Sequence, residues 1–163
     1  MRLLVKTKDK TYPIYFGENN FLKIKKILIK HRINPKKLIV IYDKNIPNKI
    51  ITKFKNNLKD YENIFLGLEF NERLKNLNTV KKILDVLGKN NFNRNDCVIS
   101  IGGGIAGDIC AFAASIFKRG LKFINIPSTL LSQVDSSIGG KTGVNNFVGK
   151  NMIGTFCQPN VVI

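Results

Sequence analysis

The 163-residue sequence has no tryptophan, a single histidine and only 11 acidic residues against 27 lysines and arginines. A structural or catalytic zinc site needs three or four protein ligands, and the lone His31 with three unpaired cysteines does not supply such a set, so no metal site is expected in this chain. No apolar run approaches the ~20 residues of a membrane span, and the first residues lack the apolar stretch of a secretory signal. The cysteines (Cys97, Cys110 and Cys157) lie in apolar surroundings, which predicts reduced core residues and a cytoplasmic protein.

The scarcity of acids leaves a formal net charge of +16, which by itself would suggest a nucleic-acid or membrane-surface partner. The lysines, however, are scattered singly and in pairs through residues 1–95 and are mixed with isoleucine and asparagine. This pattern indicates drift of surface positions and not a phosphate-binding stripe. We therefore expect no nucleic-acid or membrane partner, although a positive field would favour an anionic small substrate.

The apolar pattern predicts strands that alternate with helices. Two short strands, at 2–7 and 12–17, read as a hairpin with its turn over residues 8–11. Later strands are expected at 37–43, 63–68, 96–104, 121–127 and 159–163, and helices at 19–33, 47–59, 71–89, 106–117 and 128–139. The order is typical of an α/β, Rossmann-like domain with a parallel sheet flanked by helices. Residues 1–163 read as one such domain, and the strand at the end reads as unfinished, so further sequence is expected to follow.

A glycine-rich loop, "ISIGGGIAGD", follows the buried strand near residue 100. Gly102, Gly104 and Gly107 form a G-x-G-x-x-G, whose amides at a helix N-terminus can hold a pyrophosphate. The motif alone is weak, because it also suits a tight strand-to-helix turn and no acid follows about twenty residues on. Asp43 ends an earlier strand, where ribose-binding groups lie in open α/β sheets, but a turn or helix cap explains it equally well.

A second polar stretch follows the strand at 121–127. Ser128 and Thr129 open a helix, where hydroxyls can cap the helix or bind phosphate. Asp135 lies among apolar neighbours and therefore calls for a partner or a function. Lys141 and Lys150 come from glycine-bounded turns, so they are either solvated lysines or groups on a backbone shaped for close approach.

Residues 99–163 closely resemble the 3-dehydroquinate synthase family. The resemblance rests on the spacing of the glycine loop, "FKRG", "IPST", "QVDSS", "GGKTG" and "GKNMIG". The first ninety residues fit less closely, with "YDKN" and "NERLKN" as landmarks. Members convert the phosphorylated sugar acid DAHP to 3-dehydroquinate and phosphate in the shikimate pathway, which leads to chorismate and the aromatic amino acids. They use NAD and a divalent metal, zinc or cobalt, so the resemblance implies an NAD- and metal-dependent lyase.

The resemblance also implies roles for individual residues. Arg119, otherwise a charge at a helix end, would reach the substrate phosphate of a neighbouring subunit, which implies a homodimer. Asn71 and Phe70 depart from the family pattern beside Glu72. The implied catalytic and substrate-binding residues are Asp135, Lys141, Asn151 and Arg119. The implied cofactor-binding residues are Asp43, Asn45, Glu72, Lys75, Gly103, Gly104, Ile105, Asp108, Ser128, Thr129, Leu131, Asp135, Ser136, Lys141 and Lys150.

The family's metal ligands, a Glu and two His, belong to a C-terminal helical domain that this sequence does not contain. His31 ends a lysine-rich helix and reads as a surface residue. The chain is therefore expected to be the N-terminal, NAD-binding half of the enzyme and inactive alone. Two alternatives stay open: a sister sugar-phosphate cyclase with another substrate, and a non-catalytic NAD-binding remnant.

Overall fold

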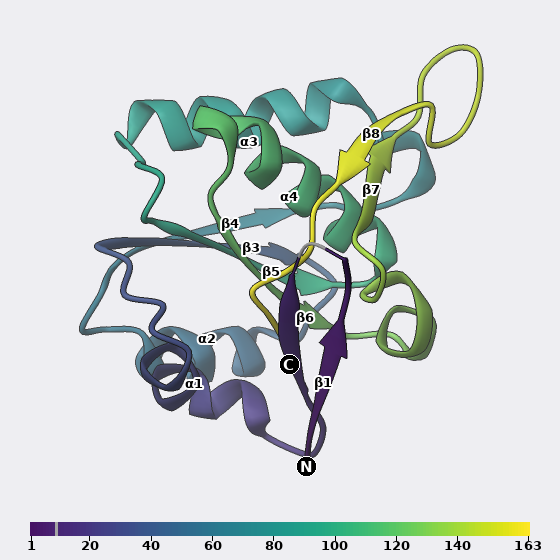
Figure 1. Ribbon diagram of the computed structural model, residues 1–163. Helices are drawn as coiled ribbons and strands as arrows, with labels where there is room; N and C mark the ends of the chain where they lie inside the picture. Colours follow the sequence, from purple (N-terminus) through teal and green to yellow (C-terminus); the bar gives the residue numbers. More distant parts are fainter. Residues whose placement is uncertain (9) are drawn as a thin grey trace.

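The computed structural model describes residues 1–8 and 10–163. Its main sheet has seven strands in the order β1-β2-β9-β6-β5-β3-β4, and a two-stranded sheet, β7-β8, stands beside it (Figure 1). The strands of the main sheet are β1 (Arg2–Lys6), β2 (Thr11–Tyr15), β3 (Lys37–Asp43), β4 (Glu62–Leu68), β5 (Cys97–Gly102), β6 (Lys122–Pro127) and β9 (Val161–Val162). β1 and β2 are antiparallel, whereas the remaining pairs in this sheet are parallel, so the predicted α/β fold with an N-terminal hairpin is confirmed.

Four α-helices cover the sheet on both faces. They are α1 (Ile24–Lys30), α2 (Asn48–Asn57), α3 (Leu77–Lys89) and α4 (Gly104–Ile116). Figure 1 shows α1 and α2 on one face and α3 and α4 on the other. Every residue of β5 is buried, as expected of a central strand that packs helices on both sides.

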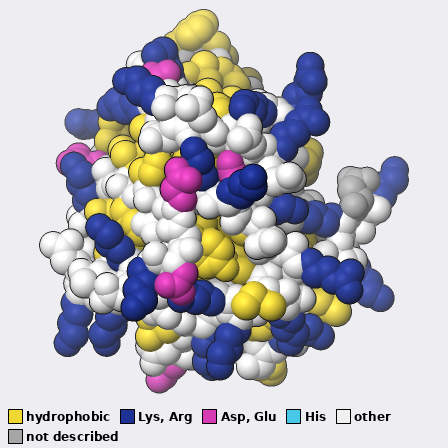
Figure 2. Space-filling view, turned by 90° about the vertical axis from the view of Figure 1, so that its left-hand side faces the viewer, with side chains coloured by type: hydrophobic (Ala, Val, Ile, Leu, Met, Phe, Trp, Pro, Cys, Tyr) yellow, Lys and Arg dark blue, Asp and Glu magenta, His cyan; other side chains and the backbone are white. Residues whose placement is uncertain are grey.

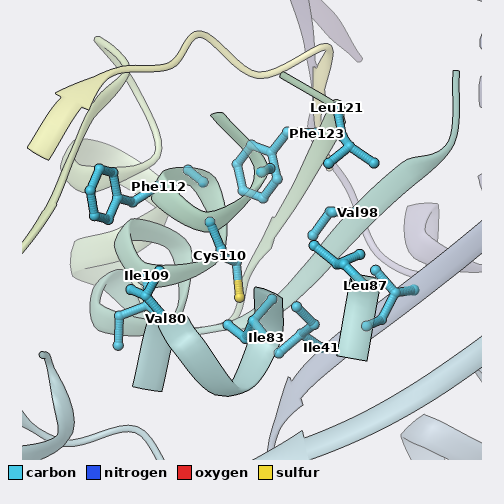
Figure 3. Close-up of a cluster of buried hydrophobic side chains, with 14 of the residues drawn as sticks. Ile41, Val80, Ile83, Leu87, Val98, Ile109, Cys110, Phe112, Leu121 and Phe123 are labelled. Carbon is cyan, nitrogen blue, oxygen red and sulfur yellow. The ribbon is translucent and has the colours of Figure 1, made fainter. Parts of the chain in front are cut away.

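Each face of the sheet has its own hydrophobic core. Under α1 and α2 the fully buried side chains include Leu28 and Phe54. Under α3 and α4 they include Ile83, Leu87 and Ile109, which Figure 3 shows converging with side chains of the sheet. The two cores hold the carboxyl ends of the parallel strands at one common edge, which is where the site lies.

The helix predicted over residues 71–89 is shorter than expected. A 3₁₀ turn covers Glu72–Leu74, and α3 begins only at Leu77. The physical reason is a pair of capping asparagines: the Asn71 side chain accepts a hydrogen bond from the Leu74 amide, and that of Asn76 accepts one from Thr79. Lys75, between them, has a φ of −77° and a ψ of 68° and so is not helical.

The segment after β6 also differs from the prediction. The helix predicted over 128–139 is present but shorter: residues 130–136 are helical, and Ser132–Ser136 form a π-helical turn. The stretch expected to be a loop contains the antiparallel hairpin of β7 (Lys141–Val144) and β8 (Ile153–Phe156). Figure 1 shows the loop that joins β7 and β8 projecting from the edge of the molecule.

Several smaller predictions can be compared with the structure. Cys97 and Cys110 are buried free thiols, and burial raises the pKa of Cys110 to about 12. His31 is half-buried and not a free surface residue, because its Nε2 lies 2.7 Å from the Tyr15 hydroxyl. The expected turn over 8–11 includes Asp9, which lies outside the described residues.

Two surface features follow from composition. Lysine and arginine side chains are spread over the face seen in Figure 2 and do not gather in one stripe. Among the helices of the described residues, none is long and apolar enough to cross a membrane.

Candidate functional site

A hollow of about 500 Å³ opens at the carboxyl ends of β3, β5 and β6, and we call it the glycine-loop hollow. Open parallel sheets bind ligands at this edge because their loops converge there. Its lining residues are Asp43, Asn45, Ile46, Pro47, Ile50, Phe70, Gly103, Gly104, Ile105, Ala106, Ser128 and Thr129. Seven of the predicted cofactor residues therefore meet here: Asp43, Asn45, Gly103, Gly104, Ile105, Ser128 and Thr129.

Neighbouring side chains closely approach the glycines at the start of α4. A Cβ on Gly104 would lie 2.7 Å from the Ser136 hydroxyl, and one on Gly103 would lie 3.3 Å from the Thr129 methyl group. No side chain caps α4, so the first amides of the helix have no side-chain acceptor. Bare backbone and free amides at the N-terminus of a helix suit a phosphate group.

Two side chains on the rim are held by local hydrogen bonds. Asp43 Oδ1 accepts a hydrogen bond from the Asn45 amide at 2.9 Å, so Asp43 shapes the turn and also lines the hollow. Thr129 donates its hydroxyl to the buried Ser132 hydroxyl at 2.9 Å. Ser132 was not predicted, because a serine in a helical stretch gives no signal that it orients a neighbour.

A second hollow of about 620 Å³ lies between α4, the π-helical turn and β7-β8, and we call it the hairpin hollow. Its lining residues are Asp108, Asp135, Ser136, Ile138, Lys141, Thr142, Gly143, Asn151, Met152, Gly154, Thr155 and Phe156. Asp135 is exposed to solvent, so the expectation of a buried acid in need of a partner was wrong. The exposed Asp135 and Lys141 leave the hollow with ionisable groups of both signs.

The two hollows adjoin at Ser136. This residue lines the hairpin hollow, and its hydroxyl is the atom that a Cβ on Gly104 would meet in the glycine-loop hollow. The glycine loop and Lys141 are therefore on the same side of the molecule, although they line two neighbouring hollows and not a single crevice.

A buried ammonium group lies beside the hairpin hollow. Lys75, only 6% exposed, donates to Asp108 Oδ2 at 2.5 Å and to Asn151 Oδ1 at 2.6 Å. Burial raises the pKa of the Asp108 carboxyl, and Lys75 opposes that rise. Lys75 lines neither hollow, but both of the residues that it binds line the hairpin hollow.

Glu72 belongs to a separate, exposed contact with the β7-β8 loop. Its Oε1 accepts a hydrogen bond from Asn145 Nδ2 at 2.7 Å and lies 3.8 Å from Lys150 Nζ. The hydrogen bond from Asn145 holds the pKa of Glu72 below its usual value, with Lys150 and Lys75 adding to the effect. Neither Glu72 nor Lys150 lines one of the two hollows.

Two predicted residues lie elsewhere. Leu131 is 69% exposed and lines neither hollow. Arg119 is exposed beside Arg94 and Lys118 in a different hollow. Lys118 and Arg119 both have positive φ, at 46° and 67°, so the turn that presents Arg119 is strained.

The described residues contain no group of three or more His, Cys, Asp or Glu side chains placed to bind a metal ion. The chemistry of the two hollows is thus that of amides, hydroxyls, acids and lysine, which suits an anionic, hydroxylated ligand.

The comparison with family models settles the relationship. A model described as the N-terminal part of 3-dehydroquinate synthase matches residues 66–163. The chain belongs to the 3-dehydroquinate synthase family. The 3-dehydroquinate synthase of Pelagibacter ubique is 50% identical over 166 residues, which cover 100% of this chain and 44% of that protein. The chain therefore spans less than half the length of this relative.

Solved structures agree with the family assignment. A 2-deoxy-scyllo-inosose synthase, complexed with carbaglucose-6-phosphate, NAD+ and Co2+, matches with a TM-score of 0.91 and 25% identity over 99% of this chain and 44% of its own. A 2-epi-5-epi-valiolone synthase from Streptomyces hygroscopicus, with NAD+ and Zn2+ bound, gives 0.82 at 24% identity over 97% of this chain and 44% of its own. The second match shows the shared fold alone.

Proposed function

We propose that residues 1–163 are the N-terminal, NAD-binding domain of a 3-dehydroquinate synthase, which converts DAHP to 3-dehydroquinate and phosphate. The observation that carries this proposal is the pair of adjoining hollows at the carboxyl edge of the parallel sheet. One offers bare glycine backbone and helix amides, and the other offers lysine, carboxylate and amide groups. Such a domain would belong to a biosynthetic enzyme of the cytoplasm.

The glycine-loop hollow fits NAD. Asp43 and Asn45 would hold the adenosine end, and the amides of Gly103 and Gly104 would donate hydrogen bonds to the pyrophosphate at the start of α4. Ile105, Ser128 and Thr129 would line the remainder of the cofactor, and the exposed Leu131 would contact it from outside the hollow. NAD supplies the oxidation and re-reduction of a substrate carbon when it is bound.

The hairpin hollow would receive the phosphorylated sugar acid. Lys141 and Asn151 would bind the anionic groups and hydroxyls, and Asp135 and Ser136 would contact substrate and cofactor from the π-helical turn. Asp108, Lys75, Glu72 and Lys150 would support this wall and the nicotinamide end of the cofactor. Arg119, on its strained turn, would serve the active site of a second copy in a homodimer.

The metal that the family uses does not fit the described residues, because they hold no ligand group for it. We therefore derive no step through a metal here. NAD binding is expected of this chain alone, and turnover is not.

The test is phosphate release from DAHP with NAD and zinc or cobalt. The chain alone should give none, and addition of the C-terminal portion of the Pelagibacter ubique relative should restore it. Substitution Lys141→Ala should abolish the restored activity, whereas Lys81→Ala, on the exposed face of α3, should not. Turnover by the chain alone would contradict the proposal that catalysis needs the C-terminal portion.

The second candidate is a sister cyclase, which the carbaglucose-6-phosphate complex of 2-deoxy-scyllo-inosose synthase favours. Glucose 6-phosphate offered in the same assay separates the two. Phosphate release from it, with none from DAHP, would replace the first proposal by the second.

A further inference from the structure

Asn145 lies outside both hollows, yet its polar groups join three parts of the site. Its Nδ2 donates to Glu72 Oε1 at 2.7 Å, and its Oδ1 accepts the amide of Asn151 at 2.8 Å. Its own amide donates to the Lys75 carbonyl at 2.8 Å. A single residue therefore fastens the loop between β7 and β8 to the 3₁₀ turn that precedes α3.

These bonds form part of a continuous chain of contacts. The main-chain amide of Asn151 donates to Asn145, and the side-chain oxygen of Asn151 accepts a hydrogen bond from the buried Lys75 ammonium. Lys75 also donates to Asp108. Asn151 and Asp108 both line the hairpin hollow. The position of Asn145 thus determines where the wall of that hollow and the charge behind it lie.

The chemistry requires an amide at this position. Asn145 must donate to a carboxylate and accept from a backbone amide at once, which an ionised aspartate or an alanine cannot do. The main-chain φ of Asn151 is 56°, a left-handed conformation that asparagine adopts more readily than most residues. The hydrogen bond from the Asn151 amide to Asn145 Oδ1 adds to the hold on this conformation.

We propose that Asn145 is a positioning residue, which couples Glu72 to Asn151 and so holds the Lys75–Asn151 wall of the hairpin hollow in its binding geometry. The inference rests on the proposed function for the identity of the ligand. Asn145 itself lines neither hollow.

The test compares Asn145→Asp, Asn145→Ala and the double variant E72Q/N145D. The carboxylate that Asn145→Asp introduces would repel the ionised Glu72 at neutral pH, and the Asn151 amide should exchange with solvent about tenfold faster in both single variants. The amide that E72Q introduces can donate to this new carboxylate, so the double variant should return the exchange to near the original rate. E72Q should give no such rescue of Asn145→Ala.

Asn146→Ala is the matched control. Asn146 Oδ1 accepts only the Val148 and Gly149 amides at the tip of the loop, so exchange at Asn151 should stay within about twofold. Equal acceleration in Asn146→Ala, or no rescue in the double variant, would overturn the proposal. If Asn145→Asp did not fold, the exchange rates of the Asn151 amide in Asn145→Ala and Asn146→Ala would be compared instead.

The Lys75–Asn151 wall is also proposed to support the nicotinamide end of the cofactor, so NAD affinity, measured by calorimetry on the same variants, gives a second readout. Both single variants at 145 should bind NAD about tenfold more weakly than Asn146→Ala, a loss equal to about 1.4 kcal/mol. Unchanged affinity would overturn the role in binding. The exchange experiments contain no NAD, so a wild-type chain that bound no NAD would refute the proposed function and leave the exchange result standing.

Discussion

The body of the molecule, residues 24–127, and its arm, residues 128–156, differ in how far their large apolar side chains are buried. In the body, large apolar side chains such as Phe54, Leu87 and Phe92 are completely buried. In the arm they are largely exposed: Leu130, Leu131, Val134, Ile138, Phe147, Val148, Met152 and Phe156. The arm is attached by the buried Val144, which packs into the core under α3 and α4, and by polar contacts, chiefly those of Lys75, Glu72 and Asn145.

This difference shows how the site is built. The body supplies rigid strand ends and the glycine loop, and its stability comes from burial. The arm supplies the lysine, hydroxyls and amides of the hairpin hollow, and its exposed apolar side chains remain free to contact a ligand, another subunit or another domain. Substitutions in the two regions should therefore affect different properties.

The largest contrast is expected from the same substitution in the two regions. Phe54→Ala removes a fully buried ring and should lower the free energy of unfolding by about 3–5 kcal/mol. Phe147→Ala removes a ring that is 100% exposed and should change it by no more than about 0.5 kcal/mol. Urea denaturation of both variants measures the difference. Equal losses of unfolding free energy would contradict the contrast between body and arm.

Lys75 links the two regions, and the stability that it contributes should depend on pH. Lys75→Met leaves Asp108 without its partner and should cost about 3 kcal/mol at neutral pH. The pKa of Asp108 is already raised by burial and should rise further without Lys75, so the folded state binds a proton more readily than the unfolded chain. The cost should accordingly shrink as the pH falls toward about 4, which denaturation of the variant over this range measures.

Lys81→Met is the control for that variant. Lys81 and Asp85 form an exposed pair at 2.9 Å on α3, and losing it should cost no more than about 0.5 kcal/mol at any pH. If the loss of unfolding free energy in Lys75→Met did not depend on pH, Asp108 would not be the group left unpaired.

Substitutions at two glycines should have separate effects, one on NAD binding and the other on stability. Gly104→Ala would place a Cβ 2.7 Å from the Ser136 hydroxyl and should weaken NAD binding about tenfold, with little effect on unfolding. Gly88→Ala, in α3, meets nothing within 4 Å and should leave binding unchanged while adding about 0.5–1 kcal/mol of stability. Calorimetric titration of both variants with NAD provides the comparison.

The smallest effect concerns His31, in the body beside the hairpin of β1 and β2. Burial lowers the pKa of His31, and Arg2 and Lys30 lower it further, so the unfolded chain takes up the proton first. Stability should decline as the pH falls below about 6.5, by less than about 1 kcal/mol because water screens the ring. Thermal unfolding from pH 5 to 7 should lose this dependence in His31→Gln. A dependence that persisted there would point to other groups.

The sequence predicted the body better than the arm, for a physical reason. Continuous apolar runs such as residues 37–43 and 97–102 have a single stable placement, between two layers of helices. The β7-β8 hairpin has little apolar periodicity, and its two paired glycines, Gly143 and Gly154, lack the side chains that indicate a strand. Its register depends on backbone pairing and on contacts with Glu72 and Lys75, which are distant in sequence.

The site divides in the same way. The residues of the glycine-loop hollow follow strands, so their convergence at one edge could be predicted. The burial of Lys75 could not, because it depends on two capping asparagines that interrupt the expected helix. Asn145 gave no signal in the sequence, since one asparagine in a glycine-bounded stretch resembles any turn residue.

The central claim is that the glycine-loop hollow of this chain binds NAD. Its most direct test is a titration of the isotopically labelled chain with NAD, followed by the amide resonances in NMR spectra. We predict saturable shifts at Gly103, Gly104 and Thr129 and at the turn after Asp43, with smaller shifts across the arm. Shifts confined to the surface around Arg94 and Arg119, or no shifts at millimolar NAD, would contradict the claim.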